Sequence, residues 1–294
     1  MGIENRAMLV KLSVSQYSGR KLDRAISKNV EGIYRAKEGA GNWTKHIVPK
    51  NALEDITKAV SAIRIYHCNH ALPWNKHGKD CEWIISSDTY FDYTRKMGGL
   101  IETFKEAVYK FAEIYQNIKD EAPRRMGDMY DPKDFLSIDE IMRKFDVRLS
   151  VYPLPLADDW RVTDNLDEEE VTRIKQTMTD QFNESVMGTV KELWKRVGKA
   201  VGHVAEILSN DKSKIYDSLI GNLIDLVEIL PKLNLTDDQN LENARRDIET
   251  KLCSVNPDVL RDNKTLRHKT KKIAEEIMDN IAPFVGVTEV AEEE

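Results

Sequence analysis

The chain has few cysteines: only Cys68, Cys81 and Cys253 occur in 294 residues, an odd number at wide spacing. This argues against a disulfide framework and for free thiols in a reducing compartment. No apolar run approaches the ~20 residues that cross a bilayer, and the first residues show no basic segment followed by an apolar core. We therefore expect neither a membrane span nor a secretory signal, and we expect a cytoplasmic location.

Motifs of the common catalytic and nucleotide-binding families are also absent. There is no Walker loop, dinucleotide-binding glycine fingerprint, helical His-Glu-x-x-His, nucleophile elbow or kinase motif set. One cluster has residue types that bind metals: His67, Cys68, His70, His77 and Cys81. Its spacing matches no common zinc finger, which favours a polar loop with a buried thiol over a zinc site. The Asp-rich segments 130–134 and 157–160 are typical of turns, although magnesium ligands would have the same composition. We predict no catalytic activity, metal or cofactor.

The net charge of −6 is divided unevenly along the chain. Residues 1–100 contain sixteen Lys and Arg against ten Asp and Glu, whereas residues 151–294 have a net charge of −10. The first hundred residues also contain three of the five tryptophans. Positive charge predicts an anionic partner for this part, and the aromatic rings favour a partner with stackable bases.

Cations stand beside aromatic residues four times in the first hundred residues. The four groups are Tyr17 with Arg20, Lys21 and Arg24; Trp43 with Lys45, His46 and Lys50; Trp74 with Lys76, His77 and Lys79; and Tyr90 and Tyr93 with Arg95 and Lys96. Binding of a single strand needs cations along the phosphates and rings that stack on bases at ~1–3 kcal/mol each. We predict phosphate contacts from Lys11, Arg20, Lys21, Arg24, Lys45, Lys76 and Lys79, and base stacking by Tyr17, Trp43 and Trp74. The alternative is a solvated helix face with structural tryptophans.

Hydrophobic periodicity predicts an α+β fold. Residues 10–15 alternate as a strand, and after a turn at Gly19 a helix is expected with Leu22, Ile26, Val30 and Ile33 on one face. Further strands are expected at 43–48, 81–86 and 147–153, with helices at 51–67 and 87–123 and a short one that begins at Ser137. In the second half, apolar residues of a helix that begins near Asp167 recur every 3.7 residues from 171 to 208. Three more helices are expected at 215–230, 236–253 and 263–281.

The expected architecture is a small N-terminal antiparallel sheet with helices, followed by a long-helix C-terminal region, and it is not an OB-fold. Residues 1–160 would form a basic, aromatic-rich nucleic-acid-binding domain. Residues 161–284 would form a helical domain that assembles dimers or tetramers, because a helix of that length is rarely buried within one monomer. Residues 285–294 would be a disordered acidic tail that competes with nucleic acid, recruits proteins or only aids solubility.

Several segments resemble a family of bacteriophage proteins without an assigned function. They are residues 10–24, 72–74, 90–93, 127–135, 138–145 and 152–155, and the resemblance covers about residues 8–165. Tyr17 stands where that family's pattern has tryptophan. The size, the acidic end and the basic, aromatic-rich first half are also similar to the single-stranded-DNA-binding RNA polymerase cofactors of N4-like phages. That resemblance implies a non-OB fold, self-association, binding to single-stranded DNA and recruitment of a phage RNA polymerase in the host cytoplasm.

The sequence therefore predicts a non-catalytic single-stranded-DNA-binding protein that acts in phage transcription or replication. Two alternatives remain open. The first is a phage protein that binds and inhibits a host protein through its acidic second half, as a mimic of nucleic acid. The second is a metal-dependent enzyme that uses the cluster from His67 to Cys81.

Overall fold

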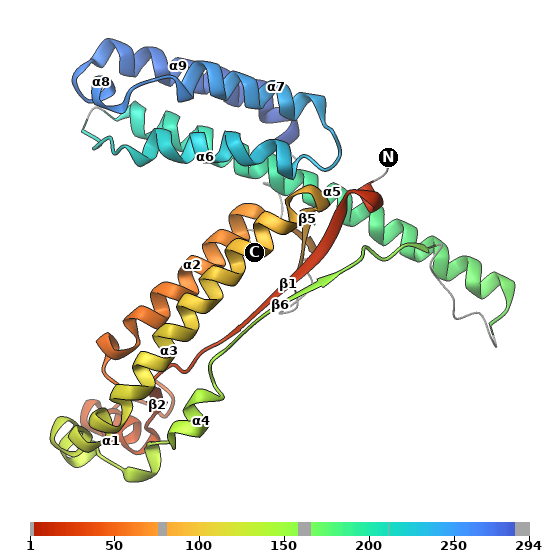
Figure 1. Ribbon diagram of the computed structural model, residues 1–294. Coiled ribbons are helices and arrows are strands. Elements are labelled where there is room, and N and C mark those ends of the chain that lie inside the picture. The colour runs from red at the N-terminus through yellow and green to blue at the C-terminus, as the bar shows by residue number, and fades with distance from the viewer. Residues whose placement is uncertain (1–2, 76–80, 158–165, 211, 286–294) are drawn as a thin grey trace. The chain divides into compact units, whose positions relative to one another are not determined.

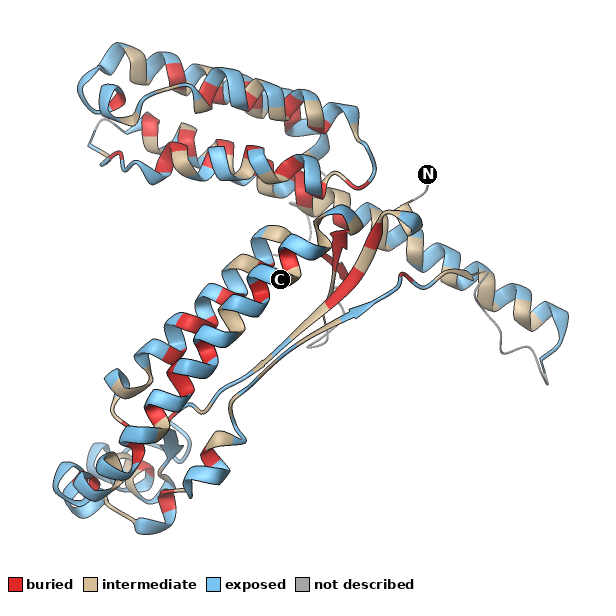
Figure 2. Ribbon diagram, viewed as in Figure 1, coloured by how far each residue is buried: buried red, intermediate tan, exposed pale blue. Residues whose placement is uncertain are grey.

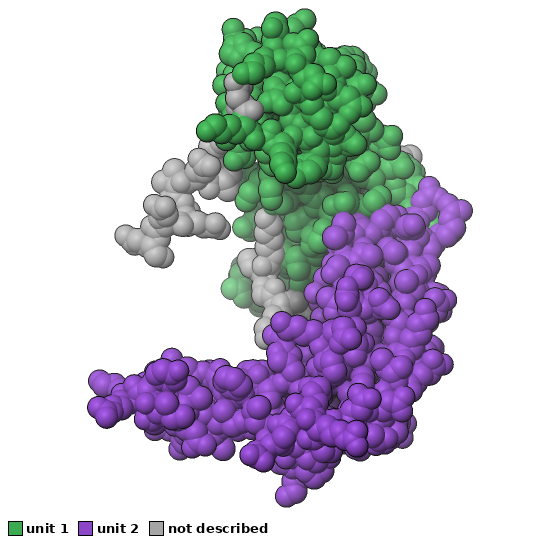
Figure 3. Space-filling view, turned by 90° about the vertical axis from the view of Figure 1, so that its left-hand side faces the viewer, with its two compact units in different colours: residues 1–11, 68–91, 150–294 green, residues 12–67, 92–149 purple. Residues whose placement is uncertain are grey.

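The computed structural model describes residues 3–75, 81–157, 166–210 and 212–285 (Figure 1). It is 70% helical with a small four-stranded antiparallel sheet, which confirms the α+β prediction. The chain divides into two compact units (Figure 3). We call residues 1–11, 68–91 and 150–294 the acidic unit, with a net charge of −10, and residues 12–67 and 92–149 the basic unit, with a net charge of +4.

These units do not follow a linear boundary at residue 160. The acidic unit includes residues 1–11 and 68–91 because their strands share a hydrophobic core with the C-terminal helices. Leu9 and Leu72, for example, belong to the same buried cluster as Leu193 and Val197. The uneven charge along the sequence therefore corresponds to a difference in net charge between the two compact units.

The sheet has the strand order β4-β5-β1-β6. Its strands are β1 (Ala7–Ser15), β4 (Leu72–Asn75), β5 (Glu82–Ser86) and β6 (Asp146–Tyr152). β5 pairs antiparallel with both β1 and β4, and Ala7 lies opposite Ser86. Strand β4 was not predicted, because its Leu-Pro-Trp-Asn sequence has the proline that usually ends a strand. It lies at a sheet edge and has a bulge after Pro73, where a missing N–H costs least. This open sheet differs from the five-stranded barrel of an OB-fold.

Helices make up most of the acidic unit. They are η1 (Ile3–Asn5), η3 (Ser87–Thr89), α5 (Glu168–Ser209), α6 (Ser218–Leu233), α7 (Gln239–Ile248), the π-helical turn η7 (Glu249–Cys253), α8 (Pro257–Asp262) and α9 (Lys264–Val285). α5 begins directly after Asp167, where its start was predicted, and the Asp167 side chain caps it by accepting the Glu170 N–H at 2.7 Å. Buried positions on α5 begin only at Thr189, so its N-terminal half is not enclosed within the described residues (Figure 2).

Most of α2 (Glu54–His70) and most of α3 (Tyr90–Met126) belong to the basic unit, where the two helices lie side by side and bury their facing sides (Figures 1 and 2). The core positions include Ile56 and Ile63 on α2 and Met97, Phe104 and Phe111 on α3. α3 runs through Pro123, where a helix end was predicted, and its last turn is completed at Met126. The smaller elements are β2 (Arg20–Leu22), α1 (Arg24–Tyr34), β3 (Thr44–His46), η2 (Lys50–Leu53), η4 (Gly127–Met129), η5 (Pro132–Asp134) and α4 (Ile138–Met142).

The prediction of a helix directly after Gly19 was wrong. Residues 20–22 instead pair antiparallel with residues 44–46 as β2 and β3. α1 begins only after Asp23, whose carboxylate accepts the N–H groups of Ala25 and Ile26 and so caps the helix. The expected apolar face is not buried: Leu22 is 42% exposed and Ile33 is 76% exposed.

Candidate nucleic-acid interface

Gly19 fixes the turn that joins β1 to β2. Its φ is +65°, and an added Cβ would lie 2.9 Å from Leu53 Cδ1 and 3.2 Å from Val48 Cβ. The Gly19 carbonyl accepts the N–H groups of Ile47 at 2.8 Å and Val48 at 3.2 Å. The turn therefore holds the residues after β1 against the end of β3 and the start of α2, and only glycine fits both the dihedral angle and the space.

Replacing Gly19 with alanine is expected to lower the free energy of unfolding by about 1–3 kcal/mol, because a left-handed non-glycine residue is strained and its Cβ meets Leu53. Urea unfolding would measure the change. Gly41→Ala is the control, since Gly41 lacks a positive φ and no atom lies within 4 Å of an added Cβ. Equal stability of the two variants would contradict this account of the turn.

A groove of about 670 Å³ opens beside this turn, and we call it the Tyr17 groove. It is lined by Gln16, Tyr17, Ser18, Arg20, His46, Val48, Lys50, Asn51, Leu53, Glu54, Ile56, Thr57 and Lys58. Three cations converge on it from three elements: Arg20 from β2, Lys50 from η2 and Lys58 from α2. This arrangement places positive charge beside an aromatic ring and suits a phosphate-bearing chain.

The three cations of the Tyr17 groove differ in their ion pairing. Lys58 forms an ion pair with Glu54 at 2.7 Å, and this hydrogen bond raises the pKa of Lys58 and lowers that of Glu54. Both side chains are exposed, so the pair is weak and can exchange for a phosphate contact. Arg20 and Lys50 are exposed and have no ion-pair partner within the part of the chain that the structure describes.

Tyr17 is half-buried at the wall of this groove. Burial and then the nearby charge of Asp134 raise the pKa of its hydroxyl. The phenol therefore stays neutral at physiological pH, which avoids charge repulsion with a phosphate. The ring is held in place while part of it remains open to the groove.

Two of the predicted phosphate contacts, Lys21 and Lys45, belong instead to an ion cluster with Asp23 and Asp134, which we call the Lys45 cluster. Lys45 Nζ lies 3.0 Å from Asp23 Oδ2, contacts Asp134 Oδ2 and donates to the Met129 carbonyl at 3.2 Å. Lys21 Nζ donates to the other oxygen of Asp134. Two cations face two carboxylates, so the cluster attracts no additional anion.

The pKa values in this cluster follow from its ion pairs. Burial alone would raise the pKa of Asp134, but hydrogen bonds from Lys21 and Lys45 outweigh it and hold that pKa below its ordinary value. Burial would likewise lower the pKa of Lys45, and hydrogen bonds to Asp134 and Asp23 raise it instead. The prediction that Lys45 contacts phosphate is corrected, because this side chain is 9% exposed and its ammonium is already paired.

The prediction that Trp74 stacks on a base also requires correction. It is 7% exposed in the core of the acidic unit, where its ring meets Phe182 edge-on at a centroid distance of 5.3 Å. No face of the indole is open to stack on a base. Lys11 is half-buried on β1 in the same unit, and Lys76 and Lys79 lie outside the described residues, as do His77 and the acidic tail from 286.

The other predicted residues stay accessible in the basic unit. Arg24 is exposed at the first position of α1 and has no ion-pair partner in the described ranges. Trp43 is 44% exposed immediately before β3. It does not line the Tyr17 groove but belongs to a separate apolar hollow on α1.

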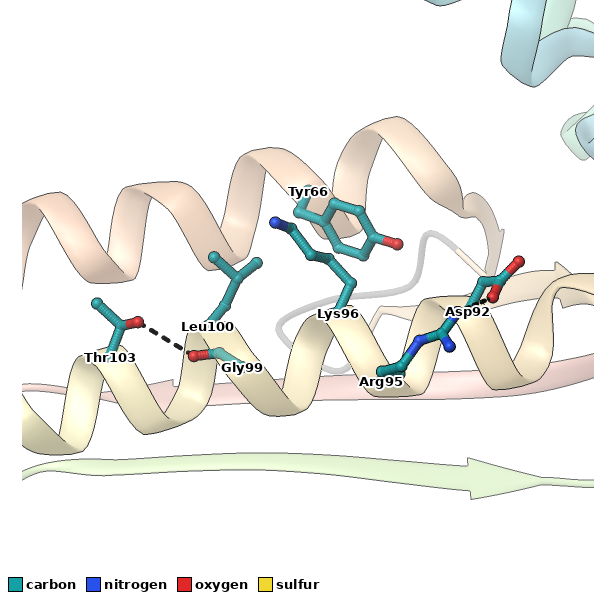
Figure 4. Close-up of a pocket in the computed structure, with 7 residues that line it drawn as sticks. All are labelled: Tyr66, Asp92, Arg95, Lys96, Gly99, Leu100 and Thr103. Carbon is teal, nitrogen blue, oxygen red and sulfur yellow. Dashed lines mark hydrogen bonds and ion pairs between the residues drawn. The ribbon is translucent and has the colours of Figure 1, made fainter.

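A second polar hollow of about 660 Å³ lies between α2 and α3, lined by Tyr66, Asp92, Arg95, Lys96, Gly99, Leu100 and Thr103 (Figure 4). Lys96 extends toward the Tyr66 ring, and Arg95 pairs with Asp92. Tyr66 stacks on Tyr93 with centroids 5.9 Å apart. The ring beside these cations is thus Tyr66, because the predicted Tyr93 is buried with its hydroxyl 2.5 Å from His67 Nδ1.

Among the residues that the structure describes, no group of three or more His, Cys, Asp or Glu side chains is placed to hold a metal ion. The residues of the suggested metal cluster from His67 to Cys81 differ in their exposure. His67 is buried against Tyr93, whereas Cys68 is exposed.

None of the described helices has the length and apolar character needed to cross a membrane.

Sequence reasoning did not find Lys58 and Tyr66, which line the two polar hollows, or Tyr34, which lines the apolar hollow beside Trp43. Lys58 and Tyr66 come from α2, whereas Tyr17 and Arg20 in the one hollow and Lys96 in the other come from distant parts of the chain. For Lys50, which also lines the Tyr17 groove, the one available sequence signal was its proximity to Trp43 and Lys45.

The fold and the groove define a two-unit α+β chain whose basic unit presents cations and open aromatic rings. Comparison with protein families, with curated proteins and with solved structures gives no match to any of them.

Proposed function

We propose that the basic unit binds single-stranded DNA without catalysis and that the Tyr17 groove holds its phosphates. The observation that carries the proposal is the convergence of Arg20, Lys50 and Lys58 around the half-buried ring of Tyr17. Arg20 and Lys50 are unpaired among the described residues, so a phosphate can bind them without displacing a carboxylate.

Accessible aromatic rings favour a single strand over a duplex. Tyr17 and Trp43 each leave part of a ring uncovered in the basic unit. A single strand can turn its bases onto such rings, whereas a duplex keeps the faces of its bases stacked inside. The net charge of +4 on this unit adds a general attraction for the strand.

The resemblance to phage proteins extends this proposal to phage transcription or replication in the host cytoplasm, with recruitment of an RNA polymerase to melted DNA. Self-association is part of the same proposal. It is supported by the N-terminal half of α5, where Val171, Ile174 and Met178 are only half-buried within the described chain. A second copy would cover this stripe.

The test is fluorescence anisotropy with a labelled strand of ~30 nucleotides and the matching duplex at 50 and 200 mM salt. If three cations each neutralise one phosphate, the affinity for the single strand should fall about 20-fold between these salt concentrations. The duplex should bind more weakly at both. A flat salt response, or equal binding of the two forms, would contradict the proposal.

A protein-binding function is the second candidate, and the net charge of −10 on the acidic unit favours it. Such a surface suits a basic partner protein, and would mimic nucleic acid toward a host DNA-binding protein. It requires no affinity for DNA, so the same anisotropy measurement separates the two functions.

A further inference from the structure

A small hollow on α1, which we call the Trp43 hollow, is separate from the Tyr17 groove. It is lined by Ser27, Val30, Glu31, Tyr34, Ala36, Ala40, Gly41, Asn42 and Trp43. Its volume is about 230 Å³ and its lining is almost entirely apolar. Pockets for drug-sized molecules measure roughly 300–1,000 Å³, so this hollow suits one flat ring system.

The hollow is held in shape by hydrogen bonds between α1 and the loop that follows it. Trp43 N–H donates to Ser27 Oγ at 2.8 Å, and the Trp43 carbonyl accepts the Asp23 N–H at 2.9 Å. The Glu31 carboxylate accepts the Gly39 N–H at 2.7 Å. The two walls are therefore positioned before any ligand arrives, which reduces the entropy lost on binding.

Both aromatic residues of the hollow are largely uncovered. Trp43 is 44% exposed and Tyr34 is 78% exposed, although an indole and a phenol bury readily. They come from different elements, since Tyr34 ends α1 and Trp43 precedes β3. Each ring provides a π-face on which another ring can stack.

The charge around the hollow indicates what its occupant is. Arg35 and Lys37 flank the lining residue Ala36, are exposed and have no ion-pair partner within the described ranges. The segment 12–67 that contains them has ten Lys and Arg against five Asp and Glu. An apolar side chain of a protein partner would need no such charge, whereas a base brings a phosphate with it.

We propose that the Trp43 hollow takes one unstacked nucleobase of the bound strand, with the adjoining phosphates beside Arg35 and Lys37. This inference rests on the proposed function and adds a base-binding site to its phosphate groove. Ser27 Oγ is already used, because it accepts from Trp43 and donates to the Asp23 carbonyl at 2.7 Å. With few polar groups left to read base edges, the site stacks a base and shows little base preference.

The test compares an ordinary 30-nucleotide strand with an abasic strand of the same length, which keeps the phosphates and lacks the bases. The wild type should bind the ordinary strand more tightly. Tyr34→Ala should weaken binding of the ordinary strand by roughly 5- to 140-fold, the range for loss of one stacked base, and leave the abasic strand unaffected. Tyr34→Phe keeps the ring and should bind like the wild type.

Ile33→Ala is the matched control, since Ile33 is 76% exposed on the same helix and does not line the hollow. It should change neither affinity. Equal wild-type affinity for the two strands, or equal weakening of both by Tyr34→Ala, would overturn the base site and leave the phosphate groove standing. Binding of neither strand would overturn the proposed function itself, and the hollow would then fit an apolar side chain of a protein.

Discussion

Replacing Lys45 with alanine is expected to lower the free energy of unfolding by about 3–5 kcal/mol. Its ammonium lies between Asp23 and Asp134, and the Asp134 side chain is only 2% exposed. Within the described residues, removing the cation leaves a buried carboxylate with Lys21 as its one cationic partner. Urea unfolding at neutral pH would measure the loss, which is large for one substitution in a marginally stable protein.

Two further variants separate this account from a role in phosphate binding. Lys50→Ala removes an exposed cation of the same unit and should change the stability by less than ~0.5 kcal/mol. Adding Asp134→Asn to Lys45→Ala removes the buried charge that the first change leaves with one cationic partner fewer, so part of the stability should return. If Lys45→Ala instead unfolds like the wild type and only loses affinity for DNA, Lys45 is a phosphate contact after all.

The cost of the Lys45→Ala change also depends on pH. Ion pairing outweighs burial and holds the pKa of Asp134 below its ordinary value. A carboxylate with a lowered folded-state pKa contributes stability that is present above the unfolded pKa of ~3.9 and is lost as the pH falls through the folded value. The difference in stability between the wild type and Lys45→Ala should therefore shrink in acid.

The parts of the fold with local signals were predictable. The helix starts near Asp167 and at Ser137 and the strand β1 depend on residues close in sequence, and the structure has all three. The partner strand β3 lies within the strand predicted at 43–48, but the short strand β2 was missed because three residues are too few for a periodic pattern. Its pairing partner is more than twenty residues away, so the helical spacing after Gly19 was the stronger local signal.

The candidate site shows the same limit in chemical terms. From sequence alone, a lysine is expected to be a surface cation, because its ion-pair partners are unknown. The partner of the buried Lys45 is Asp134, which lies 89 residues later in the chain. Trp74 reads as an open ring until Phe182 is placed against it. Tyr17 and Arg20 were correctly placed together, because one turn at Gly19 joins them.

Replacing both Arg20 and Lys50 with alanine is expected to weaken binding of a single strand about 25-fold at 0.1 M salt. Two phosphate contacts are lost, and their contribution to the affinity grows by this factor as the salt concentration falls from 1 M to 0.1 M. The plot of log affinity against log salt should become shallower by about 1.4 in slope. The loss should be the same for strands of different base composition, since contacts to phosphate carry no sequence information. Anisotropy titrations at several salt concentrations measure both quantities.

The matched control is the Arg64→Ala and Lys110→Ala double variant, which removes the same charge from exposed positions on α2 and α3 outside the Tyr17 groove. If only the net charge of the basic unit mattered, the two double variants would lose affinity equally. A local contact predicts a much smaller loss for the control, because screening over ~10 Å weakens distant exposed charges. Equal losses of affinity would mean that the strand is attracted by a diffuse electrostatic surface and not by the Tyr17 groove. Unchanged binding in both double variants would mean that other residues contact the phosphates.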